Sequence, residues 1–346
     1  MSDSKTSPTP PNSFDEIFAL IEQLPGADME ALTKVVEREG QLTKPAGALA
    51  RLESLTEWMA QWQAKYPPTL NHPRTVVFAG NHGVAAKGVS AFPPEVTVQM
   101  VANFRNGGAA INQLVGQIDG DLMVHEMDLD NPTADMSEGP AMSEADCVKA
   151  MAYGMMCVEP GVDLLCLGEM GIANSTAAAA LCHAMFGGKP SDWTGPGTGV
   201  EGDALTNKAR IVGQAVEVNQ GAMTSPLDIL RCVGGLELAA ITGAVLAARL
   251  ARVPVMLDGY ACTAAASVLH AIDPGLLAHC QVGHLSAEPA HQRLCQEIGK
   301  VPLLALGMRL GEGTGATLAA NLVRGAILCH TGMATFAEAA VSGKDD

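Results

Sequence analysis

Two glutamates stand in glycine-rich turns, each between an apolar run and a helix of small residues. Glu169 lies in "LLCLGEMGIANSTAAAAL" (residues 164–181) and Glu312 in "MRLGEGTGATLAANL" (residues 308–322). Glycine is favoured where the backbone turns sharply or approaches another group closely. If these turns line a dry cleft, the carboxylates lose solvation and their pKa rises, which suits a general base. A carboxylate there could also hold ligand hydroxyls. The alternative is that each carboxylate caps the N–H groups at the start of the following helix.

A third glycine-rich turn, "TGPGTGVEG" (residues 194–202), shares Gly-Thr-Gly with residues 313–315. Turns of this kind before a helix leave backbone N–H groups free, and these groups bind anions. We predict that phosphate binds there and that Lys208, early in the helix after Gly199, adds a positive charge. Neither the P-loop pattern nor G-x-G-x-x-G occurs at these turns, so tight connections without a ligand are the alternative.

Other catalytic chemistries have weaker support in the sequence. His279, His284 and His291 lie near one another but lack the H-E-x-x-H spacing. We interpret them as structural or substrate-contacting residues and expect no metal site. The G-x-S-x-G pattern of a Ser-His-Asp hydrolase does not occur.

The elements that must position these turns are short apolar runs, most of them followed by a loop and a helix of small residues. The runs are residues 74–80, 121–129, 162–171, 253–259, 279–286 and 301–308. Runs that are apolar throughout are typical of parallel strands covered on both faces. Alternation with helices indicates an α/β fold with a three-layer sandwich and a mostly parallel sheet of about six strands. Ligands of such a sheet bind at the carboxyl ends of its strands.

The N-terminal part of the chain has a different hydrophobic pattern from the rest. Residues 14–65 carry helical periodicity, and "PPTLNHP" ends this section. We therefore predict three parts: a flexible tail over residues 1–13, a small helical domain over 14–72 that is completed by 325–346, and a large α/β catalytic domain over 73–324.

Composition narrows the class of protein. The chain has 346 residues, with 48% hydrophobic and only 4% aromatic residues, so its core must be built from Ala, Val, Leu and Met. The formal net charge is −16, which repels a phosphate backbone. We expect a small-molecule enzyme that binds no nucleic acid.

Cysteines and hydrophobic stretches point to the cytoplasm. No two of the nine cysteines have C-x-x-C spacing, and we interpret them as buried free thiols in a reducing compartment. The most hydrophobic long stretch, residues 234–252, contains Glu237 and two arginines, so it fits a buried helix better than a membrane span. The N-terminus lacks the pattern of a signal peptide. We expect a cytoplasmic protein that does not bind membranes.

Several blocks of the sequence resemble the nicotinate-nucleotide–dimethylbenzimidazole phosphoribosyltransferase family. They run in the order expected of that family, from about residue 40 onward, and are "KPAGALARLE", "FAGNHGVAAKGVSAFPPEVTVQMVANFRNGGAAIN", "GEMGIANSTAAAAL", "GPGTG", "GGLELAAITGAVLAA", "VPVMLDGYACTAAA", "HLSAEPAHQ", "LGMRLGEGTGATLA" and "MATFAEAAV".

The resemblance implies a fold and a reaction. The fold is a large Rossmann-like α/β domain with a smaller, mainly helical domain, in a homodimer. The enzyme moves the 5-phosphoribosyl group of nicotinate mononucleotide onto 5,6-dimethylbenzimidazole. It releases nicotinate and forms α-ribazole 5′-phosphate for the lower nucleotide loop of cobalamin. Neither a metal nor another cofactor is implied.

The resemblance also assigns site residues. Glu312 in "LGEG" is the catalytic glutamate, which we expect to accept the proton of the benzimidazole, and Glu169 and Lys208 are the other two functional polar residues. We expect substrate to contact the backbone and polar groups of Gly171, Asn174, Ser175, Gly197, Thr198, Gly199, Gly311, Gly313, Thr314 and Gly315. We expect the base to lie in an apolar slot beside Ser90, Phe92, Gln99, Met170 and Leu310.

Two positions depart from the family pattern. Asn81 stands in "NHG" where the family often has Asp, and Ala173 replaces a common glycine. The change at Asn81 puts an acidic role there in doubt and bears on which base is preferred. The alternatives are a phosphoribosyltransferase that uses another base and a non-catalytic nucleotide-binding module. The presence of Glu312, Glu169 and Lys208 argues against the second.

Overall fold

The protein is built around a parallel β-sheet. A computed structural model describes residues 10–342, and the predicted tail therefore lies mostly outside the described residues. Five strands occur in the order β2-β1-β3-β4-β5, and every neighbouring pair is parallel. The strands are β1 (Pro73–Ala79), β2 (Asp121–Glu126), β3 (Leu164–Met170), β4 (Val255–Leu257) and β5 (Cys280–Val282).

The predicted α/β class is confirmed, and the sheet has five strands where about six were predicted. Residues 301–308 form only an isolated parallel bridge, between His284 and Leu304. Pro302 lacks an N–H group to donate, and Gly307 turns the chain with a φ of +70°. The run is also poorly covered, since Val301 and Leu306 are 69% and 61% exposed.

Helices make up the outer layers. In chain order the described helices are α1 (Phe14–Ile21), α2 (Met29–Glu39), α3 (Arg51–Gln63), η1 (Gly83–Lys87), α4 (Glu95–Arg105), α5 (Ala110–Gln117), α6 (Glu144–Met155), α7 (Asn174–Phe186), α8 (Pro190–Trp193), α9 (Gly202–Asn219), η2 (Gln220–Ala222), α10 (Pro226–Val233), α11 (Leu236–Leu250), α12 (Tyr260–Ile272), η3 (Pro274–Leu277), α13 (Ala290–Glu297), α14 (Thr314–Gly332) and α15 (Phe336–Ala339).

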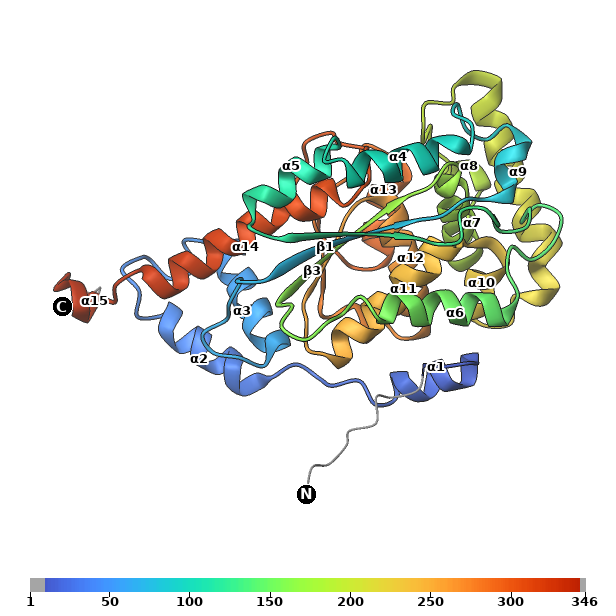
Figure 1. Cartoon of the computed structure of the whole chain (residues 1–346). Helices are drawn as coiled ribbons and strands as arrows, with labels where there is room; N and C mark the ends of the chain where they lie inside the picture. Colours follow the sequence, from blue (N-terminus) through green and yellow to red (C-terminus); the bar gives the residue numbers. More distant parts are fainter. Residues whose placement is uncertain (1–9, 343–346) are drawn as a thin grey trace.

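The sheet lies between two helical layers (Figure 1). Helices α11, α12 and α6 cover one face, with α6 packed against α11, while α14, α4 and α5 cover the other. Small residues let these helices approach closely. A Cβ at Gly154 of α6 would lie 1.9 Å from the Ala240 carbonyl oxygen of α11, and one at Gly243 would lie 2.0 Å from that of Met151. The core can therefore be dense although aromatic residues are few.

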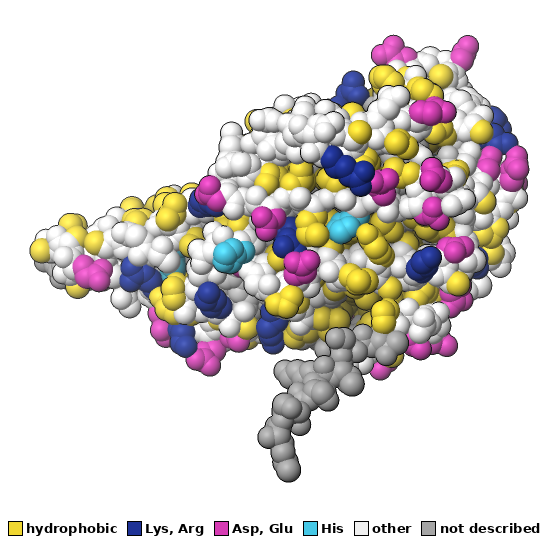
Figure 2. Space-filling view, viewed as in Figure 1, with side chains coloured by type: hydrophobic (Ala, Val, Ile, Leu, Met, Phe, Trp, Pro, Cys, Tyr) yellow, Lys and Arg dark blue, Asp and Glu magenta, His cyan; other side chains and the backbone are white. Residues whose placement is uncertain are grey.

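The hydrophobic stretch at residues 234–252 forms α11, and nearly all of this helix is buried in the core. Among the described residues, no helix is both long and apolar enough to span a membrane. All nine cysteines are free, and eight are buried as predicted, whereas Cys329 is half-buried. Figure 2 shows acidic, basic and apolar side chains interspersed over one face of the molecule.

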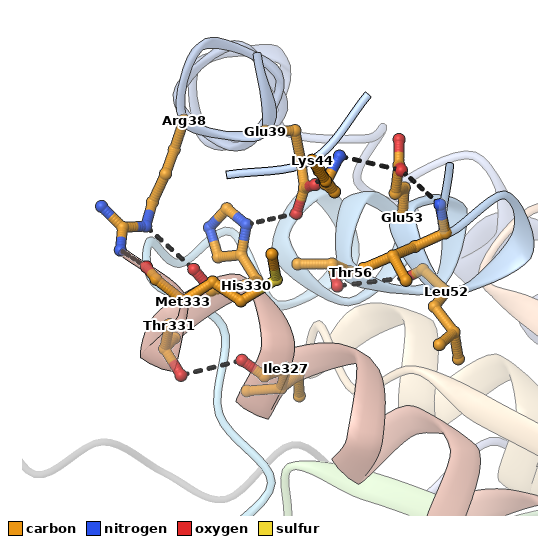
Figure 3. A network of polar contacts seen from close by, with 11 residues as sticks. Arg38, Glu39, Lys44, Leu52, Glu53, Thr56, Ile327, His330, Thr331 and Met333 are labelled. Atoms are coloured by element: carbon orange, nitrogen blue, oxygen red, sulfur yellow. Dashed lines mark hydrogen bonds and ion pairs between the residues drawn. The ribbon is translucent and has the colours of Figure 1, made fainter. Parts of the chain in front are cut away.

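The narrow end of the molecule joins α2 and α3 to the C-terminal part of α14 (Figures 1 and 3). Lys44 lies between Glu39 and Glu53, at 2.9 and 2.8 Å. His330 Nδ1 is 2.7 Å from Glu39 Oε1, and Arg38 Nε donates to the carbonyl oxygen of His330 at 2.9 Å. Helix α14 runs without interruption through the predicted boundary at residue 324. The division into domains stays a prediction.

Candidate active site

A cleft of about 450 Å³ lies at the carboxyl end of the sheet. It is lined by residues that follow β3, β4 and β5, by part of α4 and by residues 309–312. A larger hollow, of about 840 Å³, lies beyond β2 and contains none of the predicted site residues. The predicted residues that line the cleft are Phe92, Glu169, Met170, Gly171, Asn174, Ser175, Gly197, Thr198, Leu310, Gly311 and Glu312.

The two glutamate turns meet through backbone contacts. A Cβ at Gly168 would lie 2.2 Å from the nitrogen of Gly313, so the end of β3 packs directly on the start of α14. The N–H group of Glu312 donates to the carbonyl oxygen of Glu169 at 3.1 Å. A Cβ at Gly311, whose φ is +82°, would lie 2.7 Å from Glu169 Oε1. Glycine is therefore required where the carboxylate of one turn touches the backbone of the other.

Glu312 has the features of a general base. Its backbone is left-handed, with a φ of +65°, which is unusual for a residue with a side chain and typical of functional sites. Its side chain faces the cleft, only 4% of the residue is exposed, and Oε2 has no hydrogen-bond partner among the described residues. Burial, and then the charge of Asp258, raise the pKa of Glu312 to about 7.

The capping interpretation of Glu312 is wrong, because Asp258 bonds the start of α14 instead. Asp258 follows β4 and is fully buried. Its Oδ1 accepts from the N–H groups of Gly315 at 2.7 Å and Ala316 at 2.9 Å, and Oδ2 accepts from Gly313 at 3.2 Å.

These bonds correct the predicted roles of Gly313, Thr314 and Gly315. The N–H groups of the two glycines are occupied by Asp258, while the N–H and hydroxyl of Thr314 donate to the carbonyl oxygen of Gly311. None of the three residues lines the cleft. They support the turn that carries Glu312, and the N–H groups of all three already donate to other protein groups.

Glu169 is held differently from Glu312. Asn174, in the first turn of α7, donates its side-chain amide to Glu169 Oε2. Burial, and then the charge of Asp258, raise the pKa of Glu169 to about 8, although the bond from Asn174 lowers it. The capping interpretation is wrong here too: α7 begins at Asn174 with Ala173 as its N-cap, and the described bond to Glu169 comes from the Asn174 side chain and not from a backbone N–H group.

Lys208 lies beneath the 195–199 turn. Its side chain is fully buried in α9, and Nζ donates to Ser175 Oγ and to the carbonyl oxygen of Gly195, both at 2.9 Å. Burial lowers the pKa of Lys208 to about 8, although the charge of Glu288 raises it. Lys208 therefore reaches the cleft wall through Ser175.

The turn itself offers fewer donors than expected. The N–H group of Gly197 already bonds Glu288 Oε1 at 2.9 Å. Gly199 is exposed outside the cleft lining, and its N–H group donates to the carbonyl oxygen of Pro196. Two N–H groups predicted to bind phosphate are thus occupied by the protein.

Apolar side chains surround the mouth of the cleft. Phe92, Met170 and Leu310 line it as predicted, and Val96 and Met100 of α4 add to the same wall. Gln99 and Ser90 do not line it. Helical spacing puts Val96 and Met100, four residues apart, on one face of α4 and leaves Gln99 exposed on another. Ser90 Oγ instead bonds Thr198 Oγ1 at 2.8 Å.

Of the three histidines predicted to be structural or to contact substrate, His284 lines the cleft, and the structure adds Glu288 and Arg309, which were not predicted from the sequence. His284 is 1% exposed, and neither ring nitrogen has a hydrogen-bond partner among the described residues. Glu288 Oε2 is likewise buried and unpartnered. Since buried polar groups are normally hydrogen-bonded, these atoms mark positions for polar groups of a ligand. Arg309 is the one Lys or Arg among the residues described as lining this cleft.

The other histidines of that segment are structural. His291 Nδ1 accepts from the N–H group of Ser286 at 2.9 Å, and Nε2 is 3.0 Å from Thr263 Oγ1. His279 Nε2 is 3.0 Å from the carbonyl oxygen of Val245. Burial lowers the pKa of each histidine to about 3. The described residues contain no group of three His, Cys, Asp or Glu side chains placed to hold a metal.

A family model described as "Phosphoribosyltransferase" matches residues 24–341. The chain belongs to this phosphoribosyltransferase family. The nicotinate-nucleotide–dimethylbenzimidazole phosphoribosyltransferase of Rhizobium etli (strain CIAT 652) is 54% identical to this transferase over 331 residues, which are 96% of this chain and 98% of the relative. The protein of the same name from Brucella canis is 54% identical over 329 residues, which are 95% of this chain and 97% of the relative.

Two solved structures have the same fold as this transferase. A crystal structure of the Thermus thermophilus protein with that name has a TM-score of 0.84 and 39% identity, and the match covers 91% of this chain and 99% of the other. The structure of CobT from the same organism has a TM-score of 0.83 and 40% identity, with coverage of 90% and 99%. The predicted family and the α/β fold are therefore confirmed.

Proposed function

We propose that this transferase moves the 5-phosphoribosyl group of nicotinate mononucleotide onto 5,6-dimethylbenzimidazole. The products are nicotinate and α-ribazole 5′-phosphate, which supplies the lower nucleotide loop of cobalamin. The names of the relatives at 53–54% identity support this reaction. The observation that carries it in the structure is the cleft in which Glu312 presents a free carboxylate oxygen, beside Glu169.

Glu312 acts as the general base in this proposal. The ring nitrogen of the benzimidazole that carries hydrogen must lose its proton as the other ring nitrogen bonds to C1′ of the ribose. A base with a pKa near the working pH is ionised for a useful fraction of time and still binds a proton well. The pKa of about 7 that burial and Asp258 give Glu312 meets both needs.

The departure of nicotinate needs less help. Its ring nitrogen is positively charged in the nucleotide and becomes neutral when the bond to C1′ breaks. The protein must therefore align the acceptor ring with C1′ and stabilise positive charge that develops on the ribose. We assign the second task to Glu169, whose carboxylate Asn174 holds in place. Attack from the face opposite nicotinate converts a β-linked substrate into an α-linked product.

We place the phosphate at the start of α7, beside Ser175. A helix N-terminus favours an anion, and Lys208 supports the site from below through its bond to Ser175 Oγ. Arg309 lies on the same wall, where it donates to the carbonyl oxygen of Gly197 at 2.9 Å. The unpartnered atoms of His284 and Glu288 then face the ribose hydroxyls.

We further propose that the transferase works as a cytoplasmic homodimer with the two-domain division given above. Phe92 and Leu310 support the dimer, because these apolar side chains line the cleft and are 53% and 58% exposed. Exposed apolar patches of this kind are typical of interaction surfaces.

The reaction is tested by mass spectrometry of the products. The purified protein is incubated with nicotinate mononucleotide and, separately, with benzimidazoles, purines and phenols. We expect free nicotinate and a new phosphoribosylated base, with 5,6-dimethylbenzimidazole the preferred acceptor. Transfer to a purine or phenol but not to any benzimidazole would contradict the proposed acceptor. No transfer to any acceptor would contradict the proposed reaction.

A further inference from the structure

We infer that Asp258 is a positioning residue for the transfer: its carboxylate fixes the turn that carries Glu312 and keeps the floor of the cleft negatively charged. This inference rests on the proposed role of Glu312 as the base. Asp258 does not line the cleft, and so it acts through the residues it bonds.

The contacts of Asp258 define this role. Its carboxylate accepts all three bonds described above from the first residues of α14, directly after Glu312. In most helices the residue at the N-cap position supplies such an acceptor from its own side chain. Here that position is Gly313, which has no side chain and a φ of +78°. The side chain of Asp258, directly after β4, thus fixes the backbone of the turn and with it the direction of the Glu312 side chain.

The residues packed around the start of α14 hold it against Asp258. The backbone of Gly168 occupies the space beside Gly313, and the ring of His284 lies against Gly315, where a Cβ would be 1.9 Å from Cδ2. The start of α14 is therefore enclosed by β3, by the residue after β4 and by the segment after β5. A shift of Asp258 must move the Glu312 backbone relative to Glu169.

Among the described residues, no strong cation faces Asp258: burial raises its pKa, while His284 and the three N–H bonds from the start of α14 lower it. The titratable groups that face it are Glu169 at the end of β3, Glu312 before α14, His284 after β5, Cys262 in α12 and Cys166 in β3. His284 Nε2 lies 3.5 Å from Oδ1. The negative charge raises the pKa of both glutamates, and this supports the inference drawn from the contacts.

Three substitutions at Asp258 separate its charge from its hydrogen bonds. Asp258→Asn removes the charge, and its one remaining acceptor oxygen can still accept from Gly315 and Ala316. Asp258→Glu keeps the charge but lengthens the side chain. Asp258→Ser is a second charge-free variant, for use if Asn does not fold. Folding of each is checked by circular dichroism and thermal unfolding.

The readout is the dependence of kcat/KM on pH with nicotinate mononucleotide and the preferred acceptor. For Asp258→Asn we expect the acid limb to move about one unit to lower pH, because Glu312 loses a neighbouring negative charge. We expect the plateau to fall about tenfold, since a weaker base accepts the proton less well. For Asp258→Glu the limb stays in place while the plateau falls. A purely structural role would lower the plateau and leave the limb in place in every variant, and that result would overturn the inference.

Glu237→Gln is the matched control. Glu237 is also a fully buried carboxylate, but it pairs with His82 at 2.7 Å and its charge acts on Glu169 without a resolved effect on Glu312. We expect its acid limb at the wild-type position. An equal shift in Glu237→Gln would remove the specific role of Asp258.

A measurement without turnover separates this inference from the proposed function. Carbon NMR of glutamate labelled at the side-chain carboxyl follows the titration of Glu312, whose signal is the one missing in Glu312→Gln. In Asp258→Asn, or in Asp258→Ser, this titration must move to lower pH even if the enzyme uses another acceptor. An unmoved titration overturns the inference, whereas an acid limb near pH 7 that persists in Glu312→Gln overturns the assigned base.

Discussion

Carboxylates are used in opposite ways at the two ends of the molecule. At the narrow end, Glu39 and Glu53 share Lys44 (Figure 3). Burial alone would raise the pKa of Glu53, but hydrogen bonds from Lys44 and the N–H group of Leu49 outweigh it, and the pKa is lowered. In the cleft, Glu169 and Glu312 have no such cation, and burial raises the pKa of both.

The difference shows how one residue type serves either stability or chemistry. A paired carboxylate stays ionised and fixes its surroundings, so it cannot readily exchange a proton near neutral pH. An unpaired, buried carboxylate is costly to ionise but can take up a proton near pH 7. The only ammonium group beneath the cleft turn, among the described residues, is that of Lys208, and it bonds Ser175 and Gly195.

The largest effect is expected for Glu312→Gln. Loss of a general base lowers kcat by about 100- to 10,000-fold, with KM for nicotinate mononucleotide little changed. Glu53→Gln at the narrow end is the matched control, and we expect wild-type kcat there. Steady-state kinetics at pH 8 measure both. Similar kcat values for the two variants would contradict the assignment of a catalytic role to Glu312 and a structural role to Glu53.

Removal of the shared cation should act on stability alone. Lys44→Met takes the ammonium group from Glu39, which keeps His330, and from the half-buried Glu53, which keeps the N–H group of Leu49. Removing one partner of this kind costs about 1–3 kcal/mol. We expect a lower free energy of unfolding in chemical denaturation, with kcat unchanged below the new transition. A loss of kcat in the folded variant would show that the two ends are coupled.

Glu169→Gln should be milder than Glu312→Gln. The variant keeps an oxygen that can accept from Asn174, and it loses only the charge that steadies the ribose. We expect kcat to fall about 10- to 100-fold, less than the loss of a general base. Asn174→Ala, which frees the same carboxylate, should show a smaller loss in the same assay. A greater loss in Glu169→Gln than in Glu312→Gln would exchange the roles of the two residues.

The smallest effect is on the free energy of unfolding. Removing the charge should stabilise the protein at Glu312 in the cleft and destabilise it at Glu53 in the narrow end. The pKa of Glu312 in the folded protein, about 7, lies above its ordinary value of 4.5, so ionisation destabilises the fold as pH rises between these values. Glu312→Gln should therefore be more stable than wild type at pH 8, by up to about 2 kcal/mol, and the advantage should vanish at pH 4.5. Glu53, whose pKa is lowered, stabilises the fold at high pH, and Glu53→Gln should be less stable at pH 8. Thermal unfolding at the two pH values checks both signs.

Much of this architecture could be predicted because its signals are local. Apolar runs without alternation predicted five strands correctly, and both Gly-Glu turns lie at the cleft, although only the Glu169 turn is at the end of a strand. The sixth run, residues 301–308, has the same composition, but Pro302 and its exposed position limit it to one bridge.

The supporting contacts could not be predicted because they join distant segments. Nothing in "VPVMLDGYA" says that Asp258 bonds the start of a helix much later in the chain, although an acid directly after an apolar run was a usable signal. Gly313 and Gly315 resemble a free anion site until that contact is known. Lys208 likewise resembles a phosphate-binding lysine in the sequence, but in the structure its ammonium group is buried and donates to Ser175 Oγ.

The pH dependence of kcat/KM in wild type and Glu312→Gln tests the central claim most directly. If Glu312 accepts the proton of the attacking base, wild-type activity rises through an acid limb near pH 7, and ionisation of Glu169 adds a separate limb near pH 8. Glu312→Gln is slow, keeps the limb near pH 8 and lacks the limb near pH 7. A variant that retains the limb near pH 7, with only a lower plateau, would contradict the account and assign the base to another group.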